Sequence, residues 1–79
     1  MAMEQAKRRT ERVSGISNVT YDLLALLTNK LEGVAAIEEY KMDAQEAGDR
    51  EVQTLLDQLQ QQARQDVDKL RAALRSRLS

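Results

Sequence analysis

Apolar residues recur every three or four positions in two long stretches of the chain, residues 18–47 and 50–77. This spacing is typical of amphipathic helices and differs from the strict alternation of half-buried strands. The stripe of the first stretch, which includes one residue before it, consists of Ile16, Val19, Leu23, Leu24, Leu27, Leu31, Val34, Ala35, Ile37 and Met42. The second stripe consists of Val52, Leu55, Leu56, Leu59, Ala63, Val67, Leu70, Ala73, Leu74 and Leu78. The pattern therefore predicts two long helices and an all-α fold.

Residues that start and stop helices lie at the ends of both stretches. Gly15 interrupts the chain before the first stretch, and Ser17 is the expected N-cap, with Thr20 as the alternative. Gly48 is suited to the left-handed conformation that ends a helix, and Asp49 to the N-cap of the next one. Because so short a turn forces its two helices to run antiparallel, the sequence predicts a helical hairpin over residues 16–79.

A hairpin of this size leaves part of each apolar stripe uncovered. The chain has only 79 residues, and it contains no Cys for disulfides. Small domains of this kind usually need a partner chain, and soluble monomers rarely expose a long apolar trough. We therefore expect two hairpins to pair as a homodimer in a four-helix bundle. The residues expected to form the core and the dimer interface are Leu23, Leu27, Leu31, Val34, Leu56, Leu59, Ala63 and Leu70.

Composition argues against several functional classes. The absence of Cys and His removes thiolate ligands and the commonest general base and metal ligand. No nucleophile lies near a base in the pattern, so we expect no enzyme activity and no cofactor. The longest apolar run, residues 23–27, is far shorter than a membrane span requires, and the first residues lack the apolar segment of a secretory signal. A cytoplasmic protein is the resulting expectation.

Charge is distributed unevenly along the chain. Residues 1–15 are expected to form a flexible basic arm, residues 30–57 carry a net charge of −5, and residues 58–79 carry +3. Basic residues at a helix C-terminus and acidic ones at an N-terminus are explained by the helix dipole alone. The alternative is a basic patch that binds nucleic acid through Lys7, Arg8, Arg9, Arg71, Arg75 and Arg77. No aromatic residue lies among these basic residues to stack on bases.

Five charged residues lie on the predicted apolar faces, namely Lys30, Glu38, Lys41, Asp66 and Lys69. A hairpin centred near residue 48.5 places Lys30 opposite Asp66 and Val67. It places Glu38 opposite Leu59, so the expected partner of Glu38 is Lys41, one turn along the same helix, or a group on another chain. One interpretation is that these charges form ion pairs that fix the register of the bundle. A second is a metal site built from carboxylates on facing helices, and a third is that the assumed helix phase is wrong.

Gly33 lies within the first stretch, where glycine lowers helix stability by about 1 kcal/mol relative to alanine. A helical wheel places it roughly opposite the centre of the stripe. It is either a tolerated surface residue or a point where a second helix or chain approaches the back of the hairpin.

The segment EEYKMDAQEAGDREVQTLLDQL, residues 38–59, resembles the hairpins of small ferritin-like proteins in its Glu-x-Tyr-x-x-x-Ala and Ala-Gly-Asp motifs. The resemblance covers about residues 21–70 and implies a hairpin that pairs with another. The ferritin-like metal motif is degenerate, because Asp66-Val67-Asp68-Lys69 stands where Glu-x-x-His is expected, and Lys30 and Leu31 stand where the first Glu is expected. Iron chemistry is therefore not implied, and no metal ligand is assigned. Glu38 and Asp66 are the positions at which a surviving metal site would be tested.

These observations favour a non-enzymatic interaction or scaffold protein that associates with itself. A different protein is a further possible partner. The alternatives are a hairpin that binds nucleic acid through its basic termini and a metal-binding protein of ferritin-like form.

Overall fold

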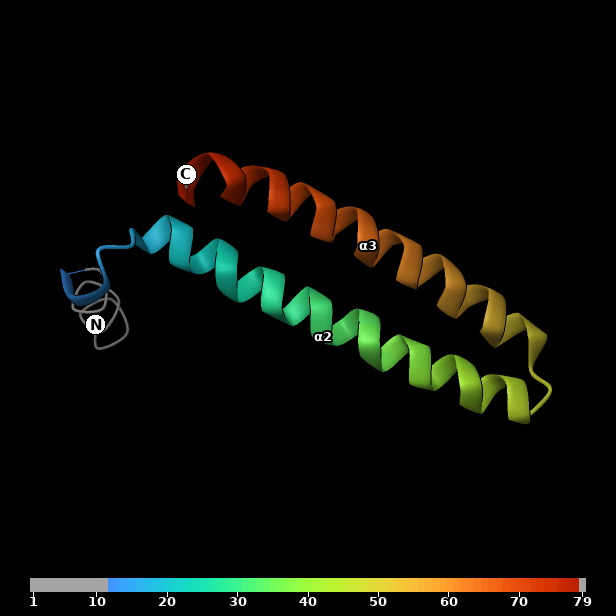
Figure 1. Ribbon diagram of the computed structural model, residues 1–79. Helices are drawn as coiled ribbons and strands as arrows, with labels where there is room; N and C mark the ends of the chain where they lie inside the picture. The colour runs from blue at the N-terminus through green and yellow to red at the C-terminus, as the bar shows by residue number, and fades with distance from the viewer. Residues whose placement is uncertain (1–11, 79) are drawn as a thin grey trace.

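The computed structural model describes residues 12–78 and consists of two long helices that lie side by side (Figure 1). Helix α2 spans Asn18–Glu46 and helix α3 spans Arg50–Leu78. The helices run antiparallel and are joined by residues 47–49, so the start of α2 and the end of α3 lie at the same end of the hairpin (Figure 1). We call this end the open end and the other the turn end. The predicted all-α fold with two packed helices is confirmed.

The N-terminal boundary of α2 is set by Ser17. Its hydroxyl accepts a hydrogen bond from the backbone N–H of Thr20 at 3.2 Å, as an N-cap does. Thr20, the alternative cap, is instead a buried residue of the helix, and its hydroxyl accepts a hydrogen bond from Ser17. Residues 12–14, part of the predicted flexible arm, are helical, and residues 1–11 of that arm lie outside the described residues.

The turn combines a left-handed glycine with an aspartate cap. Gly48 has φ of 69°, and its N–H bonds to the carbonyl of Gln45, while the N–H of Asp49 bonds to the carbonyl of Ala44. This pair of bonds closes the C-terminus of α2 in the Schellman arrangement. The carboxylate of Asp49 then accepts a hydrogen bond from Val52 N–H at 3.0 Å and caps α3. The observed helices end within one residue of the predicted boundaries, residues 18–47 and 50–77.

The two helices meet along a seam with a seven-residue repeat. On α3 the buried residues are Gln60, Val67 and Leu74. On α2 Gln60 bonds to Val34, Glu38 and Lys41, and of these Val34 and Lys41 are also seven apart. A seven-residue repeat is the signature of coiled-coil packing, in which the helices wrap slightly around each other. The positions that border this seam on each side therefore also recur every seven residues along each helix.

The hairpin buries few apolar side chains. Only Ala44, Val67 and Leu74 are buried hydrophobic residues within the described part of the chain. Larger apolar side chains that remain substantially exposed are Val13, Val19, Tyr21, Leu26, Leu31, Tyr40, Met42, Val52, Leu55, Leu59 and Leu78. Two helices alone do not cover the apolar surface of this sequence.

The position of the seam differs from the predicted stripe of the first helix. Val19, Leu31 and Met42 belong to that stripe but are exposed, whereas Thr20 and Ala44 are buried. The predicted stripe follows the average apolar direction of a straight helix with about 3.6 residues per turn. The actual seam follows the seven-residue repeat, which drifts about 20° per repeat relative to that direction.

Candidate functional site

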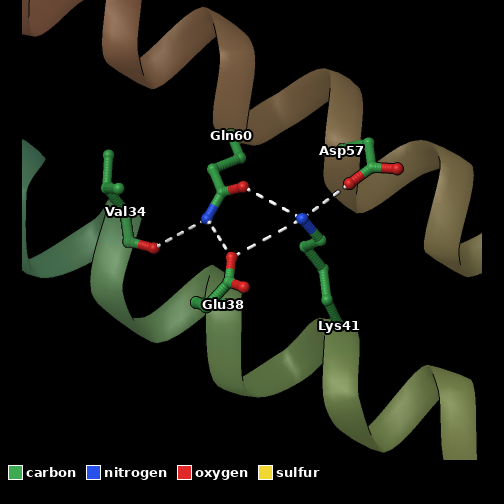
Figure 2. A network of polar contacts seen from close by, with 5 residues as sticks. All are labelled: Val34, Glu38, Lys41, Asp57 and Gln60. Carbon is green, nitrogen blue, oxygen red and sulfur yellow. Dashed lines mark hydrogen bonds and ion pairs between the residues drawn. The ribbon is translucent and has the colours of Figure 1, made fainter.

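A polar network crosses the seam in the turn half of the hairpin (Figure 2). Its centre is Gln60, whose side chain is almost completely buried. The Gln60 amide nitrogen donates to the backbone carbonyl of Val34 at 3.1 Å and to the Glu38 carboxylate at 2.9 Å. The Gln60 amide oxygen accepts from the Lys41 ammonium at 3.2 Å. All the polar atoms of this buried side chain are therefore paired, which avoids the penalty of burying them alone.

Lys41 extends the network to a second carboxylate. Its ammonium lies 2.7 Å from Asp57 of α3 and 3.5 Å from Glu38 of its own helix (Figure 2). The hydrogen bond to Asp57 is the main cause that raises the pKa of Lys41. The hydrogen bond from Gln60, followed by the charge of Lys41, lowers the pKa of Glu38. The predicted contact between Glu38 and Lys41 is confirmed, while the sequence did not indicate Gln60.

A second ion pair crosses the seam nearer its middle. The ammonium of Lys30 lies 3.1 Å from the carboxylate of Asp66, which also accepts a hydrogen bond from Gln62 at 3.2 Å. The hydrogen bond from Lys30 is the main cause that lowers the pKa of Asp66. The predicted pairing of Lys30 with Asp66 is confirmed. Lys69 is exposed and borders a hollow beside this pair.

The carboxylates named as positions for a metal test belong to separate networks. Glu38 is bound to Gln60 and Lys41, and Asp66 to Lys30 and Gln62. Over residues 12–78, no group of three or more acidic, Cys or His side chains is gathered for a metal ion. These ion pairs form only when the two helices are aligned at one register. The arrangement therefore fixes which residues of α2 face which residues of α3.

The residues predicted for the core and the dimer interface fall into two sets. Leu31 and Leu59 are about half exposed, at 51% and 48%. The others are partly covered by the opposite helix, and they are Leu23, Leu27, Val34, Leu56, Ala63 and Leu70. The first set is accessible to another chain, and the second lies along or beside the seam.

Apolar side chains continue onto both flanks of the seam. One side, which we call the Gly33 flank, carries residues at seven-residue intervals on each helix, and these are Leu26, Gly33, Tyr40, Val52, Leu59 and Asp66. The other side, the Leu31 flank, carries Leu24, Leu31, Glu38, Asp57, Arg64 and Arg71. One of the six positions named on the Gly33 flank is charged, against four of the six on the Leu31 flank. The hollows of the Gly33 flank are also lined by Lys30, the ion-pair partner of Asp66, and by Lys69.

Gly33 does not lie at the back of the hairpin, where the helical wheel places it. It borders an open groove between the helices together with Ile37 and Ala63 of the seam and Leu59 of the Gly33 flank. The expectation was wrong because Gly33 is four residues before Ile37, a spacing that puts two residues on the same side of a helix.

The basic residues gather on the last turns of α3 at the open end. Arg77 donates to the carbonyl of Ala73 at 3.0 Å, and Arg71 lies 3.9 Å from Asp68. Arg75 borders a groove with Leu24 and Leu78. Lys7, Arg8 and Arg9 of the predicted basic patch lie outside the described residues.

Neither helix of the described chain has the length and apolar content needed to cross a membrane. Comparison of the chain with protein-family models, with curated proteins and with solved structures gives no significant match. Function is therefore inferred from the surfaces of the hairpin.

Proposed function

We propose that this protein is a non-enzymatic interaction module that pairs with a second copy of itself and serves as a helical scaffold. The observation that carries the proposal is the number of leucine, valine and tyrosine side chains left about half exposed beside the seam. Large exposed apolar patches mark interaction sites in soluble proteins. A second hairpin placed on it completes a four-helix bundle.

The distribution of apolar residues between the helices supports pairing of hairpins. Helix α2 carries exposed apolar residues beyond the seam, including Leu26 and Tyr40 on the Gly33 flank. Its apolar positions are spread around more of its circumference than those of α3. A helix that is apolar on more than one side is suited to contact with more than one neighbour.

Replacing Leu59 with Asp tests the proposal. Leu59 lies on the Gly33 flank, so a carboxylate there would have to be desolvated in a dimer but stays in water in a single hairpin. We expect Leu59→Asp to reduce the sedimentation coefficient to that of one chain while circular dichroism retains helix. The matched control is Gln58→Asp, which adds the same charge one residue away on the exposed outer side of α3. Equal sedimentation of Leu59→Asp and the unmodified protein would contradict the proposal.

The ferritin-like resemblance enters this proposal only as architecture, namely a hairpin that pairs in a bundle. Metal binding would require Glu38 or Asp66 to exchange its ammonium partner for a cation. Elemental analysis of protein purified without chelator is expected to find no stoichiometric iron or manganese. A metal content near one ion per chain that falls in Glu38→Gln or Asp66→Asn would establish the metal-binding alternative.

A second candidate function is binding of nucleic acid by the open end. The observation in its favour is that Arg71 and Arg75 border the same groove on α3. Binding through phosphates would weaken steeply as salt rises. A gel shift that retards RNA or DNA at low salt, and that is lost in an Arg71→Gln, Arg75→Gln double variant, would support this function. Unchanged mobility of both nucleic acids at low salt would dismiss it.

A further inference from the structure

Neither the backbone conformation at Gly33 nor the packing within the hairpin requires a glycine at this helical position. Its φ is not positive, and a Cβ added there would meet no atom within 4 Å. Alanine would therefore fit the isolated hairpin and would favour the helix more than glycine does. The missing side chain leaves open space on the surface of the hairpin.

Bulky apolar side chains stand on either side of this space. Leu26 and Tyr40 lie seven residues before and after Gly33, so all three point to the same flank of α2. Both are about half exposed, at 48% and 53%. The hollow beside Leu26 and the groove beside Gly33 share Lys30 and Asp66 as lining residues, which makes them neighbours on one surface. The surface is thus a depression between two projections.

Leu26 and Tyr40 are equally far from Gly33 along the helix, so this surface keeps the same pattern when a copy is turned end for end. In that orientation each projection of one copy lies beside a projection of the other, and the two depressions meet. Glycine at the crossing allows two helix backbones to approach closely, as small residues do at helix contacts.

Charge selects the same orientation. The turn half of the hairpin, residues 34–63, contains seven acidic and two basic side chains. The open half, residues 18–33 and 64–78, contains four acidic and six basic ones. Two copies with their turns at the same end would bring like charges together, whereas an end-for-end pair places each acidic half against a basic half.

From these observations we propose that the second copy docks on the Gly33 flank with its α2 antiparallel to that of the first, so that Gly33 lies beside the partner's Gly33 and Leu26 beside the partner's Tyr40. This proposal rests on the self-association proposed above and specifies its surface and orientation. The Leu31 flank, with its four charged residues, stays in water.

Cysteine cross-linking tests the surface, because the chain contains no cysteine of its own. A disulfide forms between cysteines whose Cα atoms are about 4.4–6.8 Å apart. The proposed crossing brings the two Gly33 Cα atoms into this range, so the thiols of Gly33→Cys should react with each other. We expect most of this variant to run as a disulfide-linked dimer on a non-reducing gel after mild oxidation. Ala25→Cys, on the exposed outer side of α2, is the control and should give little cross-linked product.

Two further single-cysteine variants test the orientation. Leu26→Cys and Tyr40→Cys are mixed in equal amounts, allowed to exchange, oxidised and weighed by mass spectrometry. The antiparallel arrangement predicts mainly the mixed disulfide between position 26 of one chain and position 40 of the other. A parallel arrangement predicts disulfides between identical positions, and such a result would overturn the proposed orientation.

Substitution of Gly33 provides a readout without cysteine. Gly33→Leu fills the depression and should raise the dimer dissociation constant at least tenfold, although leucine favours the helix more than glycine. Unchanged association in Gly33→Leu would overturn the proposed crossing.

Leu31→Asp tests the other flank. Leu31 has an exposure close to that of Leu59, and this variant should leave association unchanged. Loss of the dimer in this variant would also contradict the proposal.

The outcomes separate this proposal from the one on which it rests. If the unmodified chain is a monomer, both fail. If the unmodified chain is a dimer but the Gly33→Cys variant does not cross-link and Gly33→Leu associates normally, self-association stands and the Gly33 surface is wrong.

Discussion

At the scale of single residues, Gln60 shows how a polar side chain is held inside a seam of aliphatic ones. Both its amide hydrogens and its amide oxygen are bonded, to Val34, Glu38 and Lys41. A polar residue at one core position of a coiled coil usually fixes which residues face each other, at some loss of stability. In this hairpin Gln60 aligns the turn half of α3 with residues 34–41 of α2.

Gln60→Ala is expected to lower the free energy of unfolding by about 1–3 kcal/mol, because it removes three hydrogen bonds and leaves space in the seam. Gln61→Ala is the matched control, since Gln61 is the same residue type at an exposed position. Its effect should stay within about 0.5 kcal/mol. Urea unfolding followed by circular dichroism measures both, and equal losses in the two variants would show that Gln60 has no special role.

The titration of Glu38 gives a pH dependence of known sign. Folding lowers the pKa of Glu38 below its ordinary value of 4.5, so the unfolded chain binds the proton more tightly than the folded one. The stabilisation is therefore complete above about pH 5 and is lost as the pH falls through the lowered pKa. Lowering the pH from about 6 to about 3 should decrease the urea concentration at the midpoint of unfolding. This decrease should be smaller in Glu38→Gln than in the unmodified protein, because the variant lacks the titrating carboxyl. An identical fall in both proteins would contradict this assignment.

At the scale of elements, the turn depends on one backbone conformation. Gly48 has φ of 69°, a region in which a Cβ costs about 1–2 kcal/mol. We expect Gly48→Ala to lower the free energy of unfolding by about this amount. Gly48→Asn should lose less, because asparagine tolerates the left-handed region better than alanine does. Equal stability of Gly48→Ala and the unmodified protein, measured by urea unfolding, would exclude this role of the turn.

The ends of the helices were predictable from sequence, whereas the residues of the seam were only partly so. Ser17, Gly48 and Asp49 act through bonds to residues within a few positions, and the chemistry of such caps is local. The pairing of Lys30 with Asp66 followed from counting outward from the turn. Gln60 was missed because a polar residue adds nothing to an apolar stripe, although its spacing of seven from Val67 and fourteen from Leu74 would have indicated it.

At the scale of the whole molecule, the hairpin has one seam with few buried apolar side chains and leaves other apolar side chains, such as Leu59, exposed beside it. Leu74 is 4% exposed within a single chain, whereas Leu59 is 48% exposed. Leu74→Ala should therefore lower the free energy of unfolding by about 2–3 kcal/mol at every protein concentration. Leu59→Ala should destabilise the protein strongly only at concentrations where the dimer forms, because only then is Leu59 covered. Urea unfolding over a range of protein concentrations distinguishes the two, and a concentration-independent effect of Leu59→Ala would argue against a dimer.

Stability and association are expected to be linked, since apolar surface left open by one hairpin is closed by the other. The mass of the unmodified full chain in solution tests this link, measured by light scattering at near-neutral pH over a dilution series. We predict twice the chain mass of 8.9 kDa at high concentration, with helical signal decreasing as dilution releases single chains. A fully helical hairpin with the mass of one chain at every concentration would contradict it.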